Sequence, residues 1–156
     1  ALLKCGRPVQ IYGLGERPRE GNLTFFPINE QSFVESLATC DALVCNAGNQ
    51  LVGEALFLGK PVLAIPEQKN FEQYINAHFL KSEGGGDWVA ADEFSSRRLR
   101  EFLATADHTR LTATRHRMNG LPETLAVIKR HLPKPAIIDV PAGLRFNNNS
   151  QFEKVA

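Results

Sequence analysis

The strongest hydrophobic pattern lies between Asp41 and Ala77, where two short apolar runs alternate with two stretches of helical spacing. The run Ala42–Cys45 is too short for a buried helix and is bounded by polar residues, and Val62–Ile65 is an equally short run between Pro61 and Pro66, so each predicts a buried parallel strand. Between these runs, apolar residues fall roughly on one helical face: Leu51, Val52, Ala55, Leu56 and Leu58. The stretch therefore predicts a strand, a helix, a second strand and a second helix.

Glycine and proline mark where these elements end. Gly59 and Pro61 stop the first helix, because glycine tolerates the left-handed cap and proline cannot continue a helix. Pro66 marks the end of the second predicted strand. The loops 46–49 and 67–70 then both follow the carboxyl ends of parallel strands, which is the edge where open α/β sheets bind ligands.

The remaining pattern extends this arrangement in both directions. It predicts strands over 8–12, 23–27 and 87–89, a helix over 30–39 capped by Asn29, and a mostly helical region over 92–131. Strands that alternate with helices on short connections predict an α/β fold with a Rossmann-like, doubly wound parallel sheet. We expect one domain over residues 1–133 and an irregular tail over 134–156, which is rich in Pro, Gly and Asn.

The first residues indicate that an element is missing. Ala1–Cys5 resemble the last turn of a helix closed by Gly6, and a predicted strand follows directly. A helix in front of a parallel strand normally has another strand before it. We therefore expect the sheet to lack its first strand, and the chain to be a fragment of a longer, two-domain protein.

Composition narrows the class of protein. The chain has 156 residues, of which 43% are apolar and 22% charged, and its formal net charge is +1. These values fit a folded domain and argue against disorder or a strongly basic surface for nucleic acid. No apolar run approaches the roughly 20 residues that span a bilayer as a helix. We expect a cytoplasmic protein with no nucleic-acid partner.

Cysteine and histidine do not point to a metal site. Cys5, Cys40 and Cys45 are odd in number and form no CxxC pair, so we expect free, structural thiols in a reducing compartment. The four histidines show no ligand spacing with one another or with cysteine. The sequence therefore predicts no bound metal.

Two residues near the first predicted loop are candidates for contact with a nucleotide. Gly48 follows a strand and precedes a helix whose first N–H groups lack internal partners, an arrangement that attracts phosphate. A tight turn containing a glycine accounts for it equally well. Glu54 lies about one turn later, where a carboxylate can accept hydrogen bonds from the diol of a ribose. An acid favoured by the helix dipole is the alternative.

The second loop leads to a similar polar cluster. Glu72 and Gln73 begin the next predicted helix and face the same crevice, and Asn76 lies one turn further on. An acid and an amide side by side suit the hydroxyl groups of a sugar. Ordinary polarity at a helix start accounts for each residue taken singly.

Taken together, these residues resemble the C-terminal, donor-binding domain of the GT-B fold glycosyltransferases. The similarity is to the branch with the lipid-II-forming N-acetylglucosaminyltransferases and the UDP-glycosyltransferases. It rests on positions in fixed order over some forty residues: Asp41–Val44, Gly48, Glu54, Gly59–Pro61, Pro66, Glu72–Gln73 and Asn76–Ala77. Outside this stretch only the order of elements agrees.

The resemblance implies a role for several residues. Gly48 and the amides of Asn49 and Gln50 would bind the diphosphate of a UDP-sugar, and Glu54 would bind the ribose. Glu72 and Gln73 would contact the transferred sugar. Phe26 and Ile28, in the segment Phe26–Ile28, would contact the uracil base.

The resemblance also implies what this chain lacks. Catalytic residues would lie in a missing N-terminal domain that also binds the acceptor, so none is expected here and the fragment alone should be inactive. Transfer of a hexosyl or N-acetylhexosaminyl group would need no cofactor and no obligatory metal. The full-length protein would touch the inner face of the membrane peripherally, and the acceptor is unknown.

Two departures from the family pattern keep alternatives open. Leu51 stands where several relatives have a hydroxyl residue, and Asn46 where the plant enzymes have histidine. Phosphate binding would then rest on backbone amides. A UDP-sugar hydrolase or epimerase of GT-B fold, and a non-catalytic nucleotide-binding module, remain as alternative functions.

Overall fold

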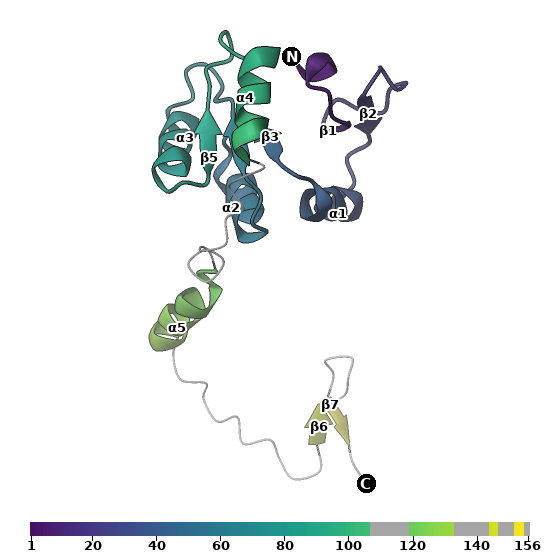
Figure 1. Cartoon of the computed structure of the whole chain (residues 1–156). Helices are drawn as coiled ribbons and strands as arrows, with labels where there is room; N and C mark the ends of the chain where they lie inside the picture. Colours follow the sequence, from purple (N-terminus) through teal and green to yellow (C-terminus); the bar gives the residue numbers. More distant parts are fainter. Residues whose placement is uncertain (107–118, 133–143, 147–151, 155–156) are drawn as a thin grey trace. The chain divides into compact units, whose positions relative to one another are not determined.

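The computed structural model describes residues 1–106, 119–132, 144–146 and 152–154. The chain divides into two compact units, Ala1–Asn119 and Gly120–Ala156, which are described separately (Figure 1). The predicted domain boundary after residue 133 stays a prediction. Of the described residues, no helix is long and apolar enough to cross a membrane.

The first unit alternates strands and helices, as the hydrophobic pattern predicts. After a 3-10 turn at Leu2–Lys4, its elements are β1 (Val9–Tyr12), β2 (Leu23–Phe26), α1 (Glu30–Thr39), β3 (Leu43–Cys45), α2 (Asn49–Phe57), β4 (Val62–Ala64), α3 (Phe71–Ser82), β5 (Gly86–Trp88) and α4 (Ser96–Ala106). The predicted helix over 30–39 is confirmed at both ends. Its cap is also confirmed, because the side chain of Asn29 accepts a hydrogen bond from the Ser32 N–H at 2.9 Å.

The strands of this unit are parallel, which confirms the predicted α/β class. β1 pairs with β2, and β4 lies between β3 and β5. They form two sheets instead of one continuous sheet, because in the described residues no strand joins β1 to β3. The register places Cys45 beside Ala64 and Ala64 beside Trp88, so the loops after β3 and β4 open at one edge.

β4 is the centre of the core, and its alternating side chains reach two separate clusters. Val62 and Ala64 pack with apolar residues of α1, α2 and α3, whereas Leu63 packs with the N-terminal turn and α4. All three side chains are fully buried. Helices therefore cover both faces of this sheet, as Figure 1 shows for α3 and α4, which is the layering of a doubly wound fold.

Two glycines are required by this packing. Gly59 ends α2 with φ +71°, in the left-handed region that side chains rarely adopt. A Cβ on Gly86 would approach the Val62 carbonyl oxygen to 1.9 Å, so only glycine allows β5 to lie against β4 there.

The second unit contains α5 (Leu121–His131) and a short antiparallel pair, β6 (Leu144–Phe146) and β7 (Phe152–Lys154). The helix was predicted within the region 92–131, of which 107–118 lie outside the described residues. The irregular tail expected over 134–156 stays a prediction; within it the structure describes only these two strands. Each strand has three residues, too few for an alternating pattern to be recognised beside an Asn-rich stretch.

Candidate functional site

The candidate site consists of the two loops that follow β3 and β4, together with the first turns of α2 and α3. The amide nitrogen Nδ2 of Asn46, in the first loop, donates to Oε1 of Glu67 in the second at 3.1 Å. Both residues are exposed at the carboxyl edge of the sheet. The hydrogen bond holds the two loops together at the edge where parallel sheets generally bind their ligands.

The start of α2 presents its backbone N–H groups without a capping side chain. Gly48 is the N-cap, in extended conformation with φ −61° and ψ 131°. A Cβ added there would meet only Oδ1 of Asn46, at 3.7 Å. The fold itself therefore does not require glycine at this position, and the space over the helix end stays accessible to a ligand.

The turn in front of this helix is strained and held from α3. Ala47 is fully buried and has φ +64°, an uncommon conformation for a residue with a Cβ. Nδ2 of Asn76 donates to the Ala47 carbonyl at 3.1 Å. Asn76, which the sequence placed one turn after Glu72 and Gln73, thus holds the backbone that leads to Gly48.

Glu54 lies on the exposed side of α2. Its Oε1 accepts a hydrogen bond from Nε2 of Gln50, one turn earlier, at 3.0 Å. Asn49 and Gln50 occupy the first turn and are exposed. The structure thus brings four predicted residues together on one helix: Gly48, Asn49, Gln50 and Glu54.

The two residues predicted to contact a sugar differ in exposure at the start of α3. Glu72 is exposed in the first turn, whereas Gln73 is buried, with 8% of its surface accessible. Oε1 of Gln73 accepts from the Glu67 N–H at 2.8 Å, and Asn70 caps the helix by accepting from the Gln73 N–H. Gln73 therefore fixes the second loop, and Glu72 is the side chain presented to solvent.

The predicted base-contact segment lies in the other sheet, at the carboxyl end of β2. Ile28 is 83% exposed, and the ring of Phe26 stacks on Tyr12 with a centroid distance of 5.2 Å. The hydroxyl of Tyr12 lies 2.7 Å from Oγ of Ser36 in α1. This segment is thus anchored to α1, the helix that leads into β3.

Sequence reasoning missed Glu67, Ala47 and Tyr12 as parts of the site. Glu67 follows the strand-ending Pro66, so an acid at the carboxyl end of a predicted strand was the available signal. The sequence carries no signal for Ala47, because its left-handed backbone conformation is visible only in the structure. Tyr12 ends the strand predicted over 8–12, so its place at the carboxyl end of a strand was a signal of the same kind.

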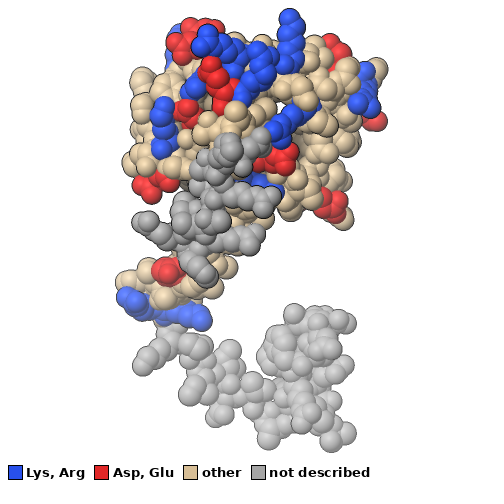
Figure 2. All heavy atoms as spheres, viewed as in Figure 1, with Lys and Arg blue, Asp and Glu red and all other residues tan. Residues whose placement is uncertain are grey.

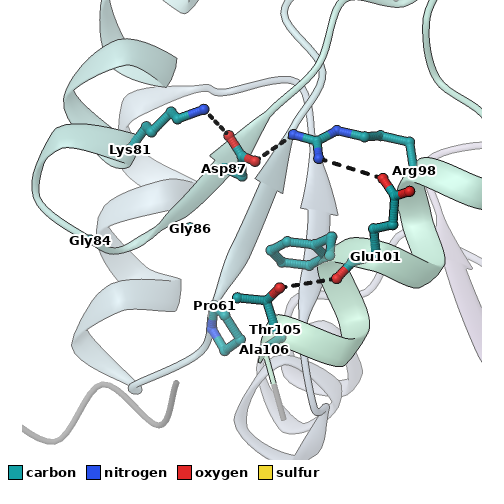
Figure 3. Close-up of a pocket in the computed structure, with 10 residues that line it drawn as sticks. Pro61, Lys81, Gly84, Gly86, Asp87, Arg98, Glu101, Thr105 and Ala106 are labelled. Carbon is teal, nitrogen blue, oxygen red and sulfur yellow. Dashed lines mark hydrogen bonds and ion pairs between the residues drawn. The ribbon is translucent and has the colours of Figure 1, made fainter. Parts of the chain in front are cut away.

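A cavity of about 320 Å³ lies at the opposite edge of the sheet, near the amino ends of β4 and β5 (Figure 3). Its charged residues already pair with one another: Asp87 bonds Lys81 at 2.9 Å and also bonds Arg98, which approaches Glu101. Partial burial works to raise the pKa of Asp87, but hydrogen bonds from Lys81, the Trp88 N–H and Arg98 outweigh it and hold the pKa below its usual value. We interpret this cluster as structural.

Charge on the face shown in Figure 2 is mixed, with acidic side chains lying among the basic ones. In α4, Arg97 pairs with Glu101 at 2.8 Å. Within the described ranges, no group of three or more His, Cys, Asp or Glu residues is arranged to hold a metal ion. The expectation that no metal is needed stays a prediction.

Comparison with known proteins gives a family. The model of glycosyl transferase family 1 matches residues 1–106. A curated relative, the UDP-N-acetylglucosamine–N-acetylmuramyl-(pentapeptide) pyrophosphoryl-undecaprenol N-acetylglucosamine transferase of Histophilus somni, is 27% identical over 95 residues. That match covers 58% of this chain and 27% of the relative, so the chain spans about a quarter of the relative's length.

Solved structures show the same fold. The glycotransferase of kitacinnamycin superposes with a TM-score of 0.63 at 22% identity, over 76% of this chain and 32% of that one. The spinosyn forosaminyltransferase SpnP gives 0.62 at 15% identity, with coverages of 82% and 39%. MurG of Acinetobacter baumannii gives 0.57 at 19% identity, with coverages of 83% and 44%. The family match over residues 1–106, together with this fold, shows that the chain belongs to glycosyl transferase family 1 and has the GT-B architecture.

Proposed function

We propose that this chain is the donor-binding half of a glycosyltransferase that takes its sugar from a UDP-sugar. The observation that carries the proposal is the uncapped start of α2 behind Gly48, with the carboxylate of Glu54 one turn beyond it. Family membership supports glycosyl transfer as the reaction class. The donor nucleotide and the type of sugar are part of the proposal.

The diphosphate would bind at the start of α2. The N–H groups of Asn49 and Gln50 are in the first turn, where intrahelical acceptors are lacking and the positive end of the helix dipole lies. Negative charge on the diphosphate grows as the bond to the sugar breaks. Backbone N–H groups fixed in this direction stabilise that charge without having to reorient.

The ribose and the transferred sugar would lie on either side of the diphosphate. Glu54 accepts hydrogen bonds from the ribose hydroxyls, in place of or beside the Gln50 amide that it now binds. Glu72 contacts the sugar, and Gln73 keeps the neighbouring loop in position through the Glu67 N–H. Phe26 and Ile28 are assigned to the uracil base. A second domain would supply the acceptor site and the catalytic base.

Calorimetric titration of the 156-residue chain with UDP, ADP, GDP and TDP tests this proposal. We expect UDP to bind at least several-fold more tightly than the other three. Tighter binding of another diphosphate would reject UDP as the donor nucleotide. Failure of all four to bind would contradict a donor site made from α2 and α3.

A further inference from the structure

One side of α3 is apolar and exposed. Phe71, Ile75 and Phe79 follow one another at intervals of four residues, and they are 81%, 56% and 64% exposed. Residues four apart are neighbours on a helix surface, so these three form a continuous stripe. The opposite side of the helix is buried in the core through Ala77 and Leu80. Contiguous exposed apolar patches of this kind mark interaction surfaces.

An open groove of about 410 Å³ follows this stripe, and its floor is aromatic. Tyr74 lies edge-on to the ring of Trp88 in β5 at a centroid distance of 6.0 Å, and His78 lies at 5.0 Å from the same ring. These contacts fix the floor before anything binds, which lowers the entropic cost of association. We call the residues that line the groove the α3 face: Phe71, Tyr74, Ile75, His78, Phe79 and Ser82.

The chemistry of the α3 face narrows the class of its occupant. None of its six side chains is an acid, a lysine or an arginine. A nucleic acid or an anionic lipid surface would be held by basic groups, which this face does not offer. Aromatic residues, with charged residues depleted, are instead typical of the centre of a protein–protein interface. The α3 face therefore fits an apolar protein surface.

The α3 face is complementary to itself when a second α3 lies antiparallel to it. Pairing about the middle of the groove places Phe71 opposite Ser82 of the second copy, and Ile75 opposite His78. At about 100° per residue these four positions lie within about 60° of one another, so they form the line of contact. Each pair sets a large apolar side chain against a smaller or flatter one, which allows the two faces to interdigitate. Antiparallel helices also bring the positive end of one dipole beside the negative end of the other.

The exposed area suffices for a reversible dimer. An aromatic side chain buries about 150–250 Å², so the stripe of Phe71, Ile75 and Phe79 offers roughly 400 Å² in each copy at the exposed fractions given above. Two copies would bury roughly 800 Å² through these side chains, and their neighbours on the helix bring the total toward the ~1,200 Å² at which standard interfaces begin. An interface of this size is typical of a weak complex.

We propose that this chain forms a two-fold symmetric dimer in which the α3 faces of two copies pack antiparallel. The contact is isologous, because both copies use the same patch, and it therefore closes at two copies. We expect a dissociation constant on the order of 10 µM, since the patch is small but its aromatic floor is already in place. The dimer is independent of the proposed function, because no residue of the α3 face is assigned to the nucleotide or the sugar.

Sedimentation equilibrium of the 156-residue chain without nucleotide, from about 1 to 300 µM, tests the dimer. The average mass should rise with concentration from 17.3 kDa toward twice that value. In the antiparallel pair the two copies of Phe79 are offset by only about 7.5 Å along the helices. Phe79→Glu therefore places two like charges close together in an apolar contact, and it should weaken association roughly 100-fold.

Val34→Glu is the matched control, because it introduces the same charge at a 48% exposed apolar position of another helix, α1. It should dimerise like the parent chain. Thermal midpoints measured by circular dichroism check that both variants fold. Amide NMR spectra recorded on dilution locate the interface independently of any substitution. Signals of residues 71–82 should shift, and those of α1 should not.

A mixture of two variants tests the symmetry. Phe79→Glu and Phe79→Lys should each remain monomeric alone, whereas an equimolar mixture should dimerise because the two-fold arrangement brings opposite charges together. A mixture that stays monomeric would refute the antiparallel pairing.

Three further results would overturn the dimer. These are a parent chain that stays monomeric at the highest concentration, association that Phe79→Glu leaves intact, and dilution shifts confined to residues outside α3. Because nucleotide is absent throughout, each of these differs from a failure of UDP to bind.

Discussion

Asn76 and Ala47 are joined by a hydrogen bond from the side-chain amide of the first to the backbone carbonyl of the second, at 3.1 Å. The bond connects α3 with a buried residue that has positive φ and precedes the cap of α2. A strained turn persists only where its surroundings hold it. The direction in which the α2 amides point therefore depends on a side chain from the next helix.

Asn76→Ala should lower the free energy of unfolding by about 1 kcal/mol, the usual net value of one hydrogen bond. Because the Ala47 turn is then less constrained, UDP should also bind more weakly. Urea denaturation and calorimetry measure the two effects. Ile75→Ala, at the neighbouring and 56% exposed position, is the control and should leave UDP affinity unchanged. An unchanged UDP affinity in Asn76→Ala would show that this hydrogen bond does not support the binding site.

Gly48→Ala should affect binding more than folding. The backbone there has φ −61°, which alanine adopts freely, and its Cβ would meet nothing closer than 3.7 Å. The added methyl group instead occupies space over the α2 amides, so we expect at least a tenfold loss of UDP affinity with little change in thermal midpoint.

Gly53→Ala is the matched control for that substitution, because Gly53 lies within the same helix and its Cβ would meet nothing within 4 Å. It should stabilise the chain by about 0.5–1 kcal/mol, since glycine weakens a helix interior. Its UDP affinity should match that of the parent chain. Equal affinities for the two alanine variants would refute a ligand at Gly48.

Glu54→Ala should weaken UDP binding by about 1.5–3 kcal/mol, the range for hydrogen bonds to a charged group. Glu35→Ala is a close control, because Glu35 accepts from Gln31 at 3.1 Å in α1 just as Glu54 accepts from Gln50 at 3.0 Å in α2. Both variants lose a similar exposed helix pair, so calorimetry isolates the ligand contact. Parallel behaviour of the two would exclude Glu54 from the ribose site.

Asp87→Asn should destabilise the chain at pH 7 by about 1 kcal/mol, as expected for a partly buried ion pair with hydrogen bonds. The folded-state pKa of Asp87 is lowered, so its contribution is present above the ordinary carboxyl pKa and disappears as pH falls through the folded value. The difference between parent and variant should therefore close below about pH 4.

Urea unfolding at pH 7, 5 and 3 measures this dependence. Asp41→Asn serves as the comparison, because Asp41 pairs with Arg7 while 77% of its side chain is exposed. We expect that exposed pair to contribute less than about 0.5 kcal/mol. A pH-independent loss in Asp87→Asn would show that shape, and not charge, determines its effect.

Local pattern predicted local structure well in this chain. The helix over 30–39 was found at both ends because a capping Asn29 and an apolar stripe coincide with its boundaries. The strands β3 and β4 were found because short apolar runs, ended by polar residues or by proline, are typical of buried parallel strands. Both kinds of signal lie within a dozen residues of the element that they specify.

Features that depend on distant partners were not predictable in the same way. The split between the two sheets depends on what lies beside β1 and β3, and no property of either strand alone encodes it. Gln73 was assigned to a sugar, and its inward rotation onto the Glu67 N–H depends on the loop packed above it. Side-chain direction at a helix start follows from tertiary contacts, which periodicity does not contain.

The succession β3, α2, β4, α3, β5 has a consequence for the order in which the chain folds. Each parallel pairing in this sheet closes over a single intervening helix, so its contacts are as local as a parallel sheet allows. We expect this half to form its nucleus around Val62–Ala64 before the β1–β2 pair consolidates. Mutations in β4 should therefore slow refolding, whereas mutations in β1 should chiefly accelerate unfolding.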